Sequence, residues 1–329
     1  MKQLVLLILF GVALIFISCQ TKPPTDPNQS PTDFGEIVVQ GNVIGAEILI
    51  NGNNSGNITP ATLTLPVGLH ILKLQKVGYA NYSTEITIYK DSSVVLSFEL
   101  QDVVEKIVLL EDFANVSCGP CVTSNKIIES LQHNYGRDRI AVIKYPTSFP
   151  SPVDPFYLAN RTDSDNRRAF YNVNTAPTVI VDGILRPLPQ DSFMIKQRVD
   201  AQLGITPKFK VEVTDSIIGD LYYVYLSVKL LNNENIDVSE IFIQTVVTET
   251  DIEFSNPPGS NGETKFYNVM RVMLPSNQGE SLANMNLNQT ISSTHFVQIK
   301  PEWKMEKLNS VVFIQNKNSK EIYQANTTF

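Results

Sequence analysis

The sequence contains little cysteine, little histidine and no excess of positive charge. Its 329 residues include three cysteines and three histidines, and 26 Lys and Arg residues face 33 Asp and Glu residues, for a formal net charge of −7. A structural zinc site takes about four Cys or His ligands, but neither a second Cys-x-x-Cys nor paired histidines accompany the one present. Nucleic acids are bound by basic patches. The composition therefore argues against zinc and against nucleic acid as a partner, and no cofactor is predicted.

The sequence also lacks an apolar run that would cross a bilayer comfortably. The run from Leu4 to Ile17 is shorter than the roughly 20 residues that a membrane-spanning helix needs. With one Lys before it, this run predicts a secretory signal peptide over residues 1–19. Ser18-Cys19 at its end resembles the lipobox of bacterial lipoproteins, although Phe16 stands where that family has Leu. The resemblance implies that Cys19 becomes the lipidated N-terminus of the mature protein. Cleavage at a nearby site and an uncleaved anchor are the open alternatives.

A proline-rich segment follows the signal. Residues 20–35, "QTKPPTDPNQSPTDFG", contain almost no apolar side chains. Such a composition favours an extended, semi-rigid spacer. We therefore expect a tether that holds two or three folded domains away from a membrane, since the rest of the chain is long enough for that number.

Residues 36–101 alternate apolar and polar positions in short runs broken by Gly and Asn. This pattern predicts strands joined by tight turns, and hence a small all-β module. A set of turn and strand residues resembles the PEGA family of β-sandwich domains, although Val43-Ile44 replace the Pro-Glu of the family name. The matching residues are Gly45, Ala46, Asn51, Gly52, Gly56, Thr59, Pro60, Leu65 to Gly68, His70, Gly78 and Tyr79.

Residues 104–206 alternate between strand and helix patterns. "KIVLLEDF" and "RIAVIKY" predict buried strands, and "APTVIVDG" predicts a third strand that ends in a turn. Between the first two, Ile127, Ile128 and Leu131 fall on one face of a predicted helix. This order, with Cys-Gly-Pro-Cys before the helix, resembles the thioredoxin fold. We therefore expect a central α/β domain of that fold.

The thioredoxin resemblance also assigns roles to individual residues. Asp112 falls on the position of a buried Asp that assists proton transfer to the second Cys, and Pro177 falls on the cis-proline that lies against the disulfide. Ser117 departs from the pattern, because thioredoxins have Trp there. This departure affects the substrate-facing surface more than the redox chemistry.

Residues 207–329 return to alternation, as in "KFKVEV", "YYVYLSVKLL", "EIFIQTVVTE" and "SVVFIQN". Five or more such strands predict a C-terminal all-β sandwich. The block "NVMRVMLP", together with "DPFY" and "APTVIVDG", resembles the outer membrane protein 28 family of lipoproteins, which joins a thioredoxin-like domain to a C-terminal sandwich. The expected fold class is therefore multidomain, with a PEGA-like sandwich, an α/β domain and a second sandwich.

The Cys-Gly-Pro-Cys motif has a physical reason to be reactive. A thiol at the start of a helix lies near unpaired N–H groups and the positive end of the helix dipole, which favour the thiolate. Cys118 is therefore the candidate nucleophile. Cys121, one turn later, is placed to attack a mixed disulfide on Cys118 and release the product.

Two functions remain open on the sequence alone. The first is thiol–disulfide exchange on envelope or secreted proteins, with protein thiols or disulfides as substrates. The second is an adhesion or scaffold lipoprotein, with envelope or surface proteins as partners, in which Cys118–Cys121 is only a structural disulfide. Both place the protein in the cell envelope, held at the outer membrane through lipid on Cys19. Whether it is an enzyme, a thiol–disulfide oxidoreductase, depends on the reactivity of Cys118.

The N-terminal prediction has a direct test. Mass spectrometry of the mature protein should find a lipid-modified Cys19 at the N-terminus, because a short apolar run ends in Ser18-Cys19. An unmodified N-terminal residue other than Cys19, or a retained signal, would contradict the prediction and leave a third free thiol.

Overall fold

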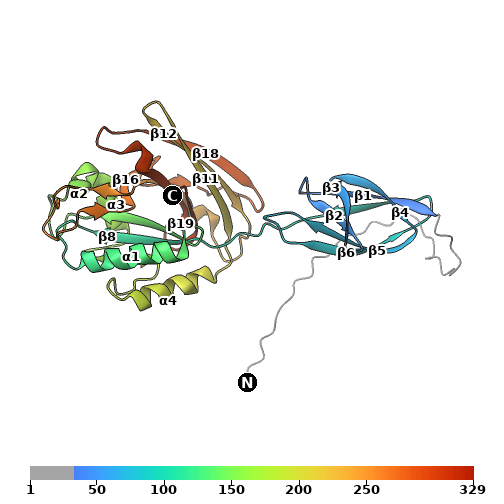
Figure 1. The fold of residues 1–329 in the computed structure, drawn as a ribbon, viewed down its shortest axis with the longest axis horizontal. Coiled ribbons are helices and arrows are strands. Elements are labelled where there is room, and N and C mark those ends of the chain that lie inside the picture. The colour runs from blue at the N-terminus through green and yellow to red at the C-terminus, as the bar shows by residue number, and fades with distance from the viewer. Residues whose placement is uncertain (1–32) are drawn as a thin grey trace, which may run out of the picture. The chain divides into compact units, whose positions relative to one another are not determined.

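The computed structural model describes residues 33–329 and divides the chain into two compact units, one up to Val103 and one over residues 104–329 (Figure 1). The signal peptide, Cys19 and the tether as far as residue 32 lie outside the described residues. Within those residues, no helix has the length and apolar character needed to cross a bilayer.

The first unit consists of two facing sheets. The order in one is β4-β1-β7 and in the other β3-β2-β5-β6. The strands are β1 (Phe34–Gly41), β2 (Glu47–Ile50), β3 (Asn53–Ile58), β4 (Ala61–Pro66), β5 (Gly68–Gln75), β6 (Tyr82–Ile88) and β7 (Ser93–Phe98). This arrangement confirms the all-β character predicted for this segment.

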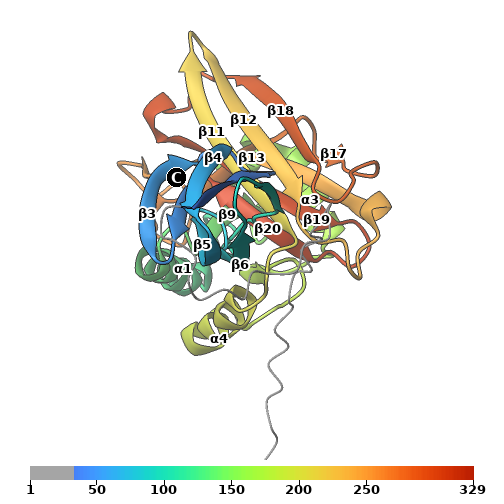
Figure 2. The same cartoon turned by 90° about the vertical axis from the view of Figure 1, so that its right-hand side faces the viewer.

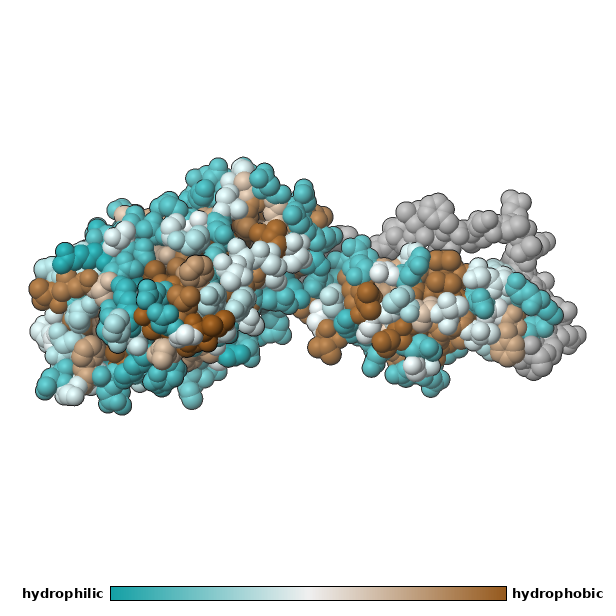
Figure 3. All heavy atoms as spheres, turned by 90° about the horizontal axis from the view of Figure 1, so that it is seen from above, coloured by the Kyte–Doolittle hydropathy of each residue, from teal (hydrophilic) through white to brown (hydrophobic). Residues whose placement is uncertain are grey.

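Alternation along the strands builds the core of the first unit. In β5, His70, Leu72 and Leu74 point inward, while Leu69 and Ile71 remain exposed. Figure 3 shows such apolar patches on the surface of this unit, interrupted by hydrophilic side chains. Leu72 and Leu74 place their side chains in one shared cluster, so a shift of one residue in register would move these side chains to solvent.

The second unit is built on a continuous eight-stranded sheet. Seven strands follow the order β10-β8-β9-β16-β13-β19-β20, and β17 pairs with β13. They are β8 (Val108–Ala114), β9 (Ile140–Pro146), β10 (Thr178–Val181), β13 (Ile241–Glu249), β16 (Val269–Leu274), β17 (Glu280–Ser281), β19 (Leu308–Asn316) and β20 (Ile322–Thr327).

Helices cover both faces of the β8–β9 part of this sheet. In Figure 1, α1 (Cys121–Tyr135) and α4 (Ser192–Leu203) lie on one side of β8, and α2 (Pro155–Ala159) and α3 (Arg161–Phe170) lie on the other. Side chains of α1 and α4 pack on the sheet in one core cluster. The expected helical face of α1 is confirmed, since Ile128 and Leu131 are buried and Ile127 packs against the same cluster.

A second sheet completes the unit. It contains β11 (Phe209–Ile218), β12 (Leu221–Leu230) and β18 (Thr290–Gln298), which lie side by side in Figure 2. Their inward residues share a core with β13 and β19. A short hairpin of β14 (Ile252–Glu253) and β15 (Lys265–Phe266) precedes β16, and two 3-10 turns lie at Val238–Glu240 and Met305–Lys307.

The predicted central α/β domain of the thioredoxin type is wrong as a fold class. The described residues hold only four short helices and far more strand than helix, arranged in several sheets. The strands expected in that domain continue into the C-terminal strands, because β9 pairs in parallel with β16 at Lys144 and Val269. Local periodicity predicted the separate strands correctly, but it carries no information about which distant strand fills an open sheet edge.

The first unit should fold independently. A fragment of residues 33–103 should show a β-type circular dichroism spectrum and a cooperative melt, because its core cluster is self-contained. Leu72→Ala should lower its free energy of unfolding by about 2–5 kcal/mol, since Leu72 is fully buried. Leu69→Ala, on an exposed side chain of the same strand, is the control and should change little. A fragment without a cooperative melt would contradict the boundary.

Candidate functional site

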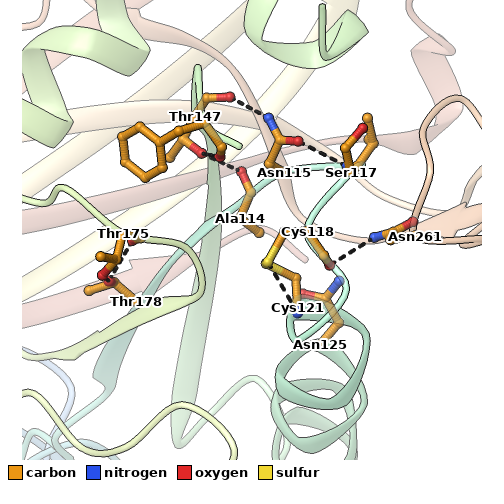
Figure 4. Close-up of a disulfide and its surroundings, with 12 residues drawn as sticks. Ala114, Asn115, Ser117, Cys118, Cys121, Asn125, Thr147, Thr175, Thr178 and Asn261 are labelled. Carbon is orange, nitrogen blue, oxygen red and sulfur yellow. Dashed lines mark hydrogen bonds between the residues drawn. A yellow bond between two sulfur atoms is a disulfide. The ribbon is translucent and has the colours of Figure 1, made fainter. Parts of the chain in front are cut away.

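Cys118 and Cys121 form a disulfide at the start of α1. The main-chain N–H of Cys121 donates to Sγ of Cys118 at 3.2 Å (Figure 4). Cys118 is 2% exposed and Cys121 is fully buried, whereas Gly119 and Pro120 between them are exposed. The hydrogen bond would stabilise a thiolate on Cys118 after reduction, because an N–H donor favours the charged form of its acceptor.

Two buried polar side chains fix the turn before Cys118. Asn115 donates to the carbonyl oxygens of Thr147 and Ser151, and its Oδ1 accepts from the N–H of Ser117 at 2.9 Å. Asp154 accepts from the N–H of Val116 at 2.8 Å while also capping α2. The main chain that leads into the disulfide is therefore held from both sides.

Asp112 lies on β8, in line with the disulfide. Residues two apart on a strand share a face, and Ala114, two residues after Asp112, packs against Cys118 and Cys121. The carboxyl group is fully buried, and neither oxygen has a hydrogen-bond partner among the described residues. Burial raises the pKa of Asp112 to about 6, while Lys144 acts to lower it and Glu263 to raise it.

Lys144 and Glu263 join the site although neither was predicted from the sequence. Lys144 pairs with Asp112 in the β8–β9 register, and its Nζ lies 3.8 Å from Oδ2 of Asp112, too far for a hydrogen bond. Glu263 accepts from Nδ2 of Asn125 on α1 at 2.8 and 3.0 Å. The single Lys in the buried run "RIAVIKY" could have indicated a buried charged partner for Lys144. Glu263 comes from a distant part of the chain, and nothing in the sequence around it indicates a place in this site.

A small pocket beside the disulfide brings these groups together. Asn125, Lys144 and Glu263 contribute to its wall, as do Ala114 and Phe156. Two of these wall residues, Lys144 and Glu263, also act electrostatically on Asp112, since both shift its pKa. Among residues 33–329, no group of three His, Cys, Asp or Glu side chains is placed to hold a metal ion.

Pro177 follows a residue that contacts the disulfide. The Ala176–Pro177 peptide bond is cis, and Ala176 packs against the cluster that contains Cys118 and Cys121. Figure 4 shows Thr175 and Thr178 of this loop on one side of the disulfide and Asn261 on the other. The structure thus gathers Cys118, Cys121, Asp112 and the Pro177 loop, while Cys19 lies outside the described residues.

Comparison with known families identifies the first unit. Residues 34–103 match the PEGA domain family, which confirms the resemblance for this part of the chain. No curated protein matches the sequence.

Comparison with solved structures supports the fold of the larger part of the chain. The structure is similar to HBP35 of Porphyromonas gingivalis with a TM-score of 0.57 and 14% identity, over 68% of this chain and 75% of that one. A protein of Agrobacterium tumefaciens aligns with a TM-score of 0.44 and 15% identity over 69% of this chain and 94% of its own. A domain of the outer membrane lipoprotein Omp28 from Porphyromonas gingivalis covers 37% of this chain and 86% of its own, with 14% identity and a TM-score of 0.26. At these identities the HBP35 likeness concerns the fold alone, and the other two scores are too low to establish a shared fold.

The raised pKa of Asp112 predicts a pH-dependent cost to stability. Between the ordinary carboxyl value of 3.8 and about 6, the folded protein retains a proton that the unfolded chain releases. Stability therefore falls as pH rises through this window. Asp112→Asn removes the effect, so the variant should gain about 3 kcal/mol over the wild type between about pH 3 and pH 8. Urea unfolding across this pH range measures the difference.

Asp200→Asn is the control for this prediction. Asp200 is exposed, and its hydrogen bonds with Lys196 and Tyr135 lower its pKa below 3.8, so its contribution to stability is lost only as pH falls below 3.8. Its removal should therefore cost a little stability by a constant amount throughout the window in which Asp112 titrates. A pH-independent difference between wild type and Asp112→Asn would show that Asp112 does not titrate as the structure indicates.

Proposed function

We propose that the Cys118–Cys121 disulfide is the centre of thiol–disulfide exchange on envelope or secreted proteins. The observation that carries the proposal is the buried carboxyl group of Asp112, which has no hydrogen-bond partner among the described residues and lies on the strand face next to the disulfide. A buried carboxyl group without a hydrogen bond destabilises a fold. A purely structural disulfide has no use for one, whereas a dithiol that exchanges protons can use it as a proton acceptor.

The reaction uses each residue of the site in turn. In the reduced protein, the Cys118 thiolate attacks a disulfide of the substrate, the substrate S–S bond breaks, and the departing substrate sulfur takes up a proton. Cys121 then loses its proton to Asp112 and attacks Sγ of Cys118. The second substrate sulfur leaves and takes up a proton, Asp112 releases its proton to solvent, and the protein ends in the disulfide form. Two electrons pass from the protein to the substrate, and the reverse sequence oxidises a substrate dithiol.

The electrostatics of the site suit the role of Asp112. A general base works best when its pKa lies near the working pH, and burial brings the pKa of Asp112 to about 6. Nζ of Lys144 lies 3.8 Å from Oδ2 of Asp112, so its positive charge compensates the negative charge of Asp112 when that carboxyl group is deprotonated. The loop of Pro177 provides a surface beside the sulfur atoms against which a substrate chain packs.

A structural role for the disulfide is the second candidate, and one observation favours it. Cys118 is only 2% exposed, while nucleophilic cysteines are usually accessible. In that case the protein serves as an adhesion or scaffold protein of the envelope.

The cellular setting of both candidates is an envelope lipoprotein of the outer membrane protein 28 type, anchored through lipid on Cys19. The signal-like N-terminus and the "NVMRVMLP" block support this setting. The PEGA domain at residues 34–103 is compatible with it.

Single cysteine variants separate the two functions. Cys121→Ser should accumulate mixed disulfides between Cys118 and envelope proteins, because attack proceeds while the second step is lost. Cys118→Ser should accumulate few, because the attacking thiolate is missing. Non-reducing gels of cell envelopes, followed by mass spectrometry of the shifted bands, measure the asymmetry. Equal absence of adducts in both variants would support the structural role and reject the exchange proposal.

A further inference from the structure

The hairpin of β14 and β15 reaches the disulfide from the C-terminal part of the chain. Its connecting segment, residues 255–264, contacts three consecutive residues that end at Cys118, through the main chain of Val116 and Cys118 and the side chain of Ser117. The N–H of Asn261 donates to the carbonyl oxygen of Val116 at 3.2 Å, and the N–H of Ser260 donates to Oγ of Ser117 at 3.3 Å. Nδ2 of Asn261 lies 3.4 Å from the carbonyl oxygen of Cys118 (Figure 4).

Glu263 ties the same segment to α1. Nδ2 of Asn261 donates to Glu263 at 2.6 Å, and Asn125 donates to both carboxylate oxygens of Glu263. The segment is therefore attached to the residues before the disulfide through Asn261 and to the helix after it through Glu263.

The base and the tip of the hairpin are held very differently. Phe254 and Phe266 at the base form an aromatic cluster with Phe156, with ring centroids 5.0 to 5.9 Å apart. Half of residues 255–264 are exposed and half are partly buried, and the direct bonds of the tip to Val116, Ser117 and Cys118 are long, at 3.2 to 3.4 Å. Apart from these, the tip is held through Glu263, which accepts from Asn125 at 2.8 and 3.0 Å. The tip can therefore lift while the aromatic base remains packed.

We infer that residues 255–264 form a latch over the Cys118–Cys121 disulfide, with Asn261 and Glu263 as the positioning residues that hold it closed. The inference rests on the proposed exchange function and adds its regulation. It explains how a reactive disulfide can have Cys118 only 2% exposed. Asn261 of the latch contacts the carbonyl oxygen of Cys118 on one side, and Ala176 packs against both cysteines on the other. We therefore expect a reacting partner to reach Sγ of Cys118 only after the tip has moved.

Gly259 provides a sharp way to open the latch. A Cβ atom at this position would lie 2.2 Å from the carbonyl oxygen of Val116, which is main chain and cannot turn aside. Gly259→Ala should therefore keep the tip away from the disulfide. Gly204→Ala is the matched control, because its Cβ would meet its nearest neighbour at an ordinary 3.5 Å and Gly204 lies at the end of α4.

The experiment measures how fast dithiothreitol reduces the disulfide in the full chain. A dithiothreitol thiolate attacks Sγ of Cys118, the bond to Cys121 breaks, and Cys121 leaves and takes up a proton. The second thiol of dithiothreitol then attacks the dithiothreitol sulfur of the mixed disulfide. Cys118 is released and takes up a proton, so that two electrons and two protons enter the protein. Alkylation of the free thiols at timed intervals, read by mass spectrometry, gives the rate.

Gly259→Ala and Asn261→Ala should each raise this rate by about tenfold, since closure depends on a few hydrogen bonds of modest net strength. Gly204→Ala should match the wild type. The final ratio of reduced to oxidised protein should stay the same in all variants, because the latch controls only access to the disulfide. If Gly259 and Asn261 served the structure alone, their replacement would lower the melting temperature and leave the rate of reduction unchanged. Asn261→Ala also keeps the test valid if Gly259→Ala fails to fold.

Wild-type rates in both folded variants would overturn the latch. That result would not bear on the exchange function, because that function is tested separately by the partner proteins trapped in Cys121→Ser. Conversely, a faster rate in the variants without trapped partners would support the latch around a disulfide that serves no exchange, and would reject the function alone.

Discussion

The pairing of β9 with β16 is the constraint on which the rest of the second unit depends. Lys144 on β9 pairs with Val269 on β16, and the N–H of Lys144 donates to the carbonyl oxygen of Asn268 at 2.8 Å. This pairing joins strands more than a hundred residues apart into one sheet. Because the β14–β15 hairpin immediately precedes β16, the same pairing brings Asn261 and Glu263 to the disulfide. The site is therefore a product of both halves of the unit.

The other buried charges of the unit show how unusual Asp112 is. Arg167 pairs with Glu111 at 2.6 Å, Lys106 with Asp182 at 2.9 Å and Arg271 with Glu249 at 2.8 Å. Each of these pairs is buried and in close contact, as a low-dielectric interior requires. Asp112 has only Lys144, at 3.8 Å. The buried carboxyl groups of Asp154 and Asp163 have no ion pair among the described residues but accept hydrogen bonds. Asp112 alone among the buried carboxyl groups described has neither a close ion pair nor a hydrogen bond, and it lies beside the only described disulfide, which is why we assign it a chemical role.

The sequence was sufficient for local structure and for the residues of the motif itself. Alternation in the first unit and the helical face of α1 were both predicted, because each follows from periodicity within a short window. Cys118 and Cys121 were named from their motif and Asp112 from the resemblance to thioredoxins. The structure places Asp112 on the strand face beside the disulfide, and the roles assigned to all three stay predictions. The fold class and the place of Glu263 in the site were not predicted, since both depend on the pairing of β9 with β16, a strand far away in the sequence. Lys144 differs, because a Lys inside a buried run is itself a signal of a buried partner, which here is Asp112 on the neighbouring strand.

The reduction potential of the Cys118–Cys121 pair distinguishes an exchange centre from a structural disulfide. Equilibration of the wild-type protein with dithiothreitol redox buffers, read by alkylation, gives this value. Structural disulfides lie below about −300 mV, whereas exchange proteins lie between about −270 and −120 mV. We expect a reduction potential between about −270 and −120 mV, because Cys118 accepts a hydrogen bond from the first N–H of α1 and Asp112 is available to take a proton. A potential below about −300 mV would contradict it and identify the disulfide as structural.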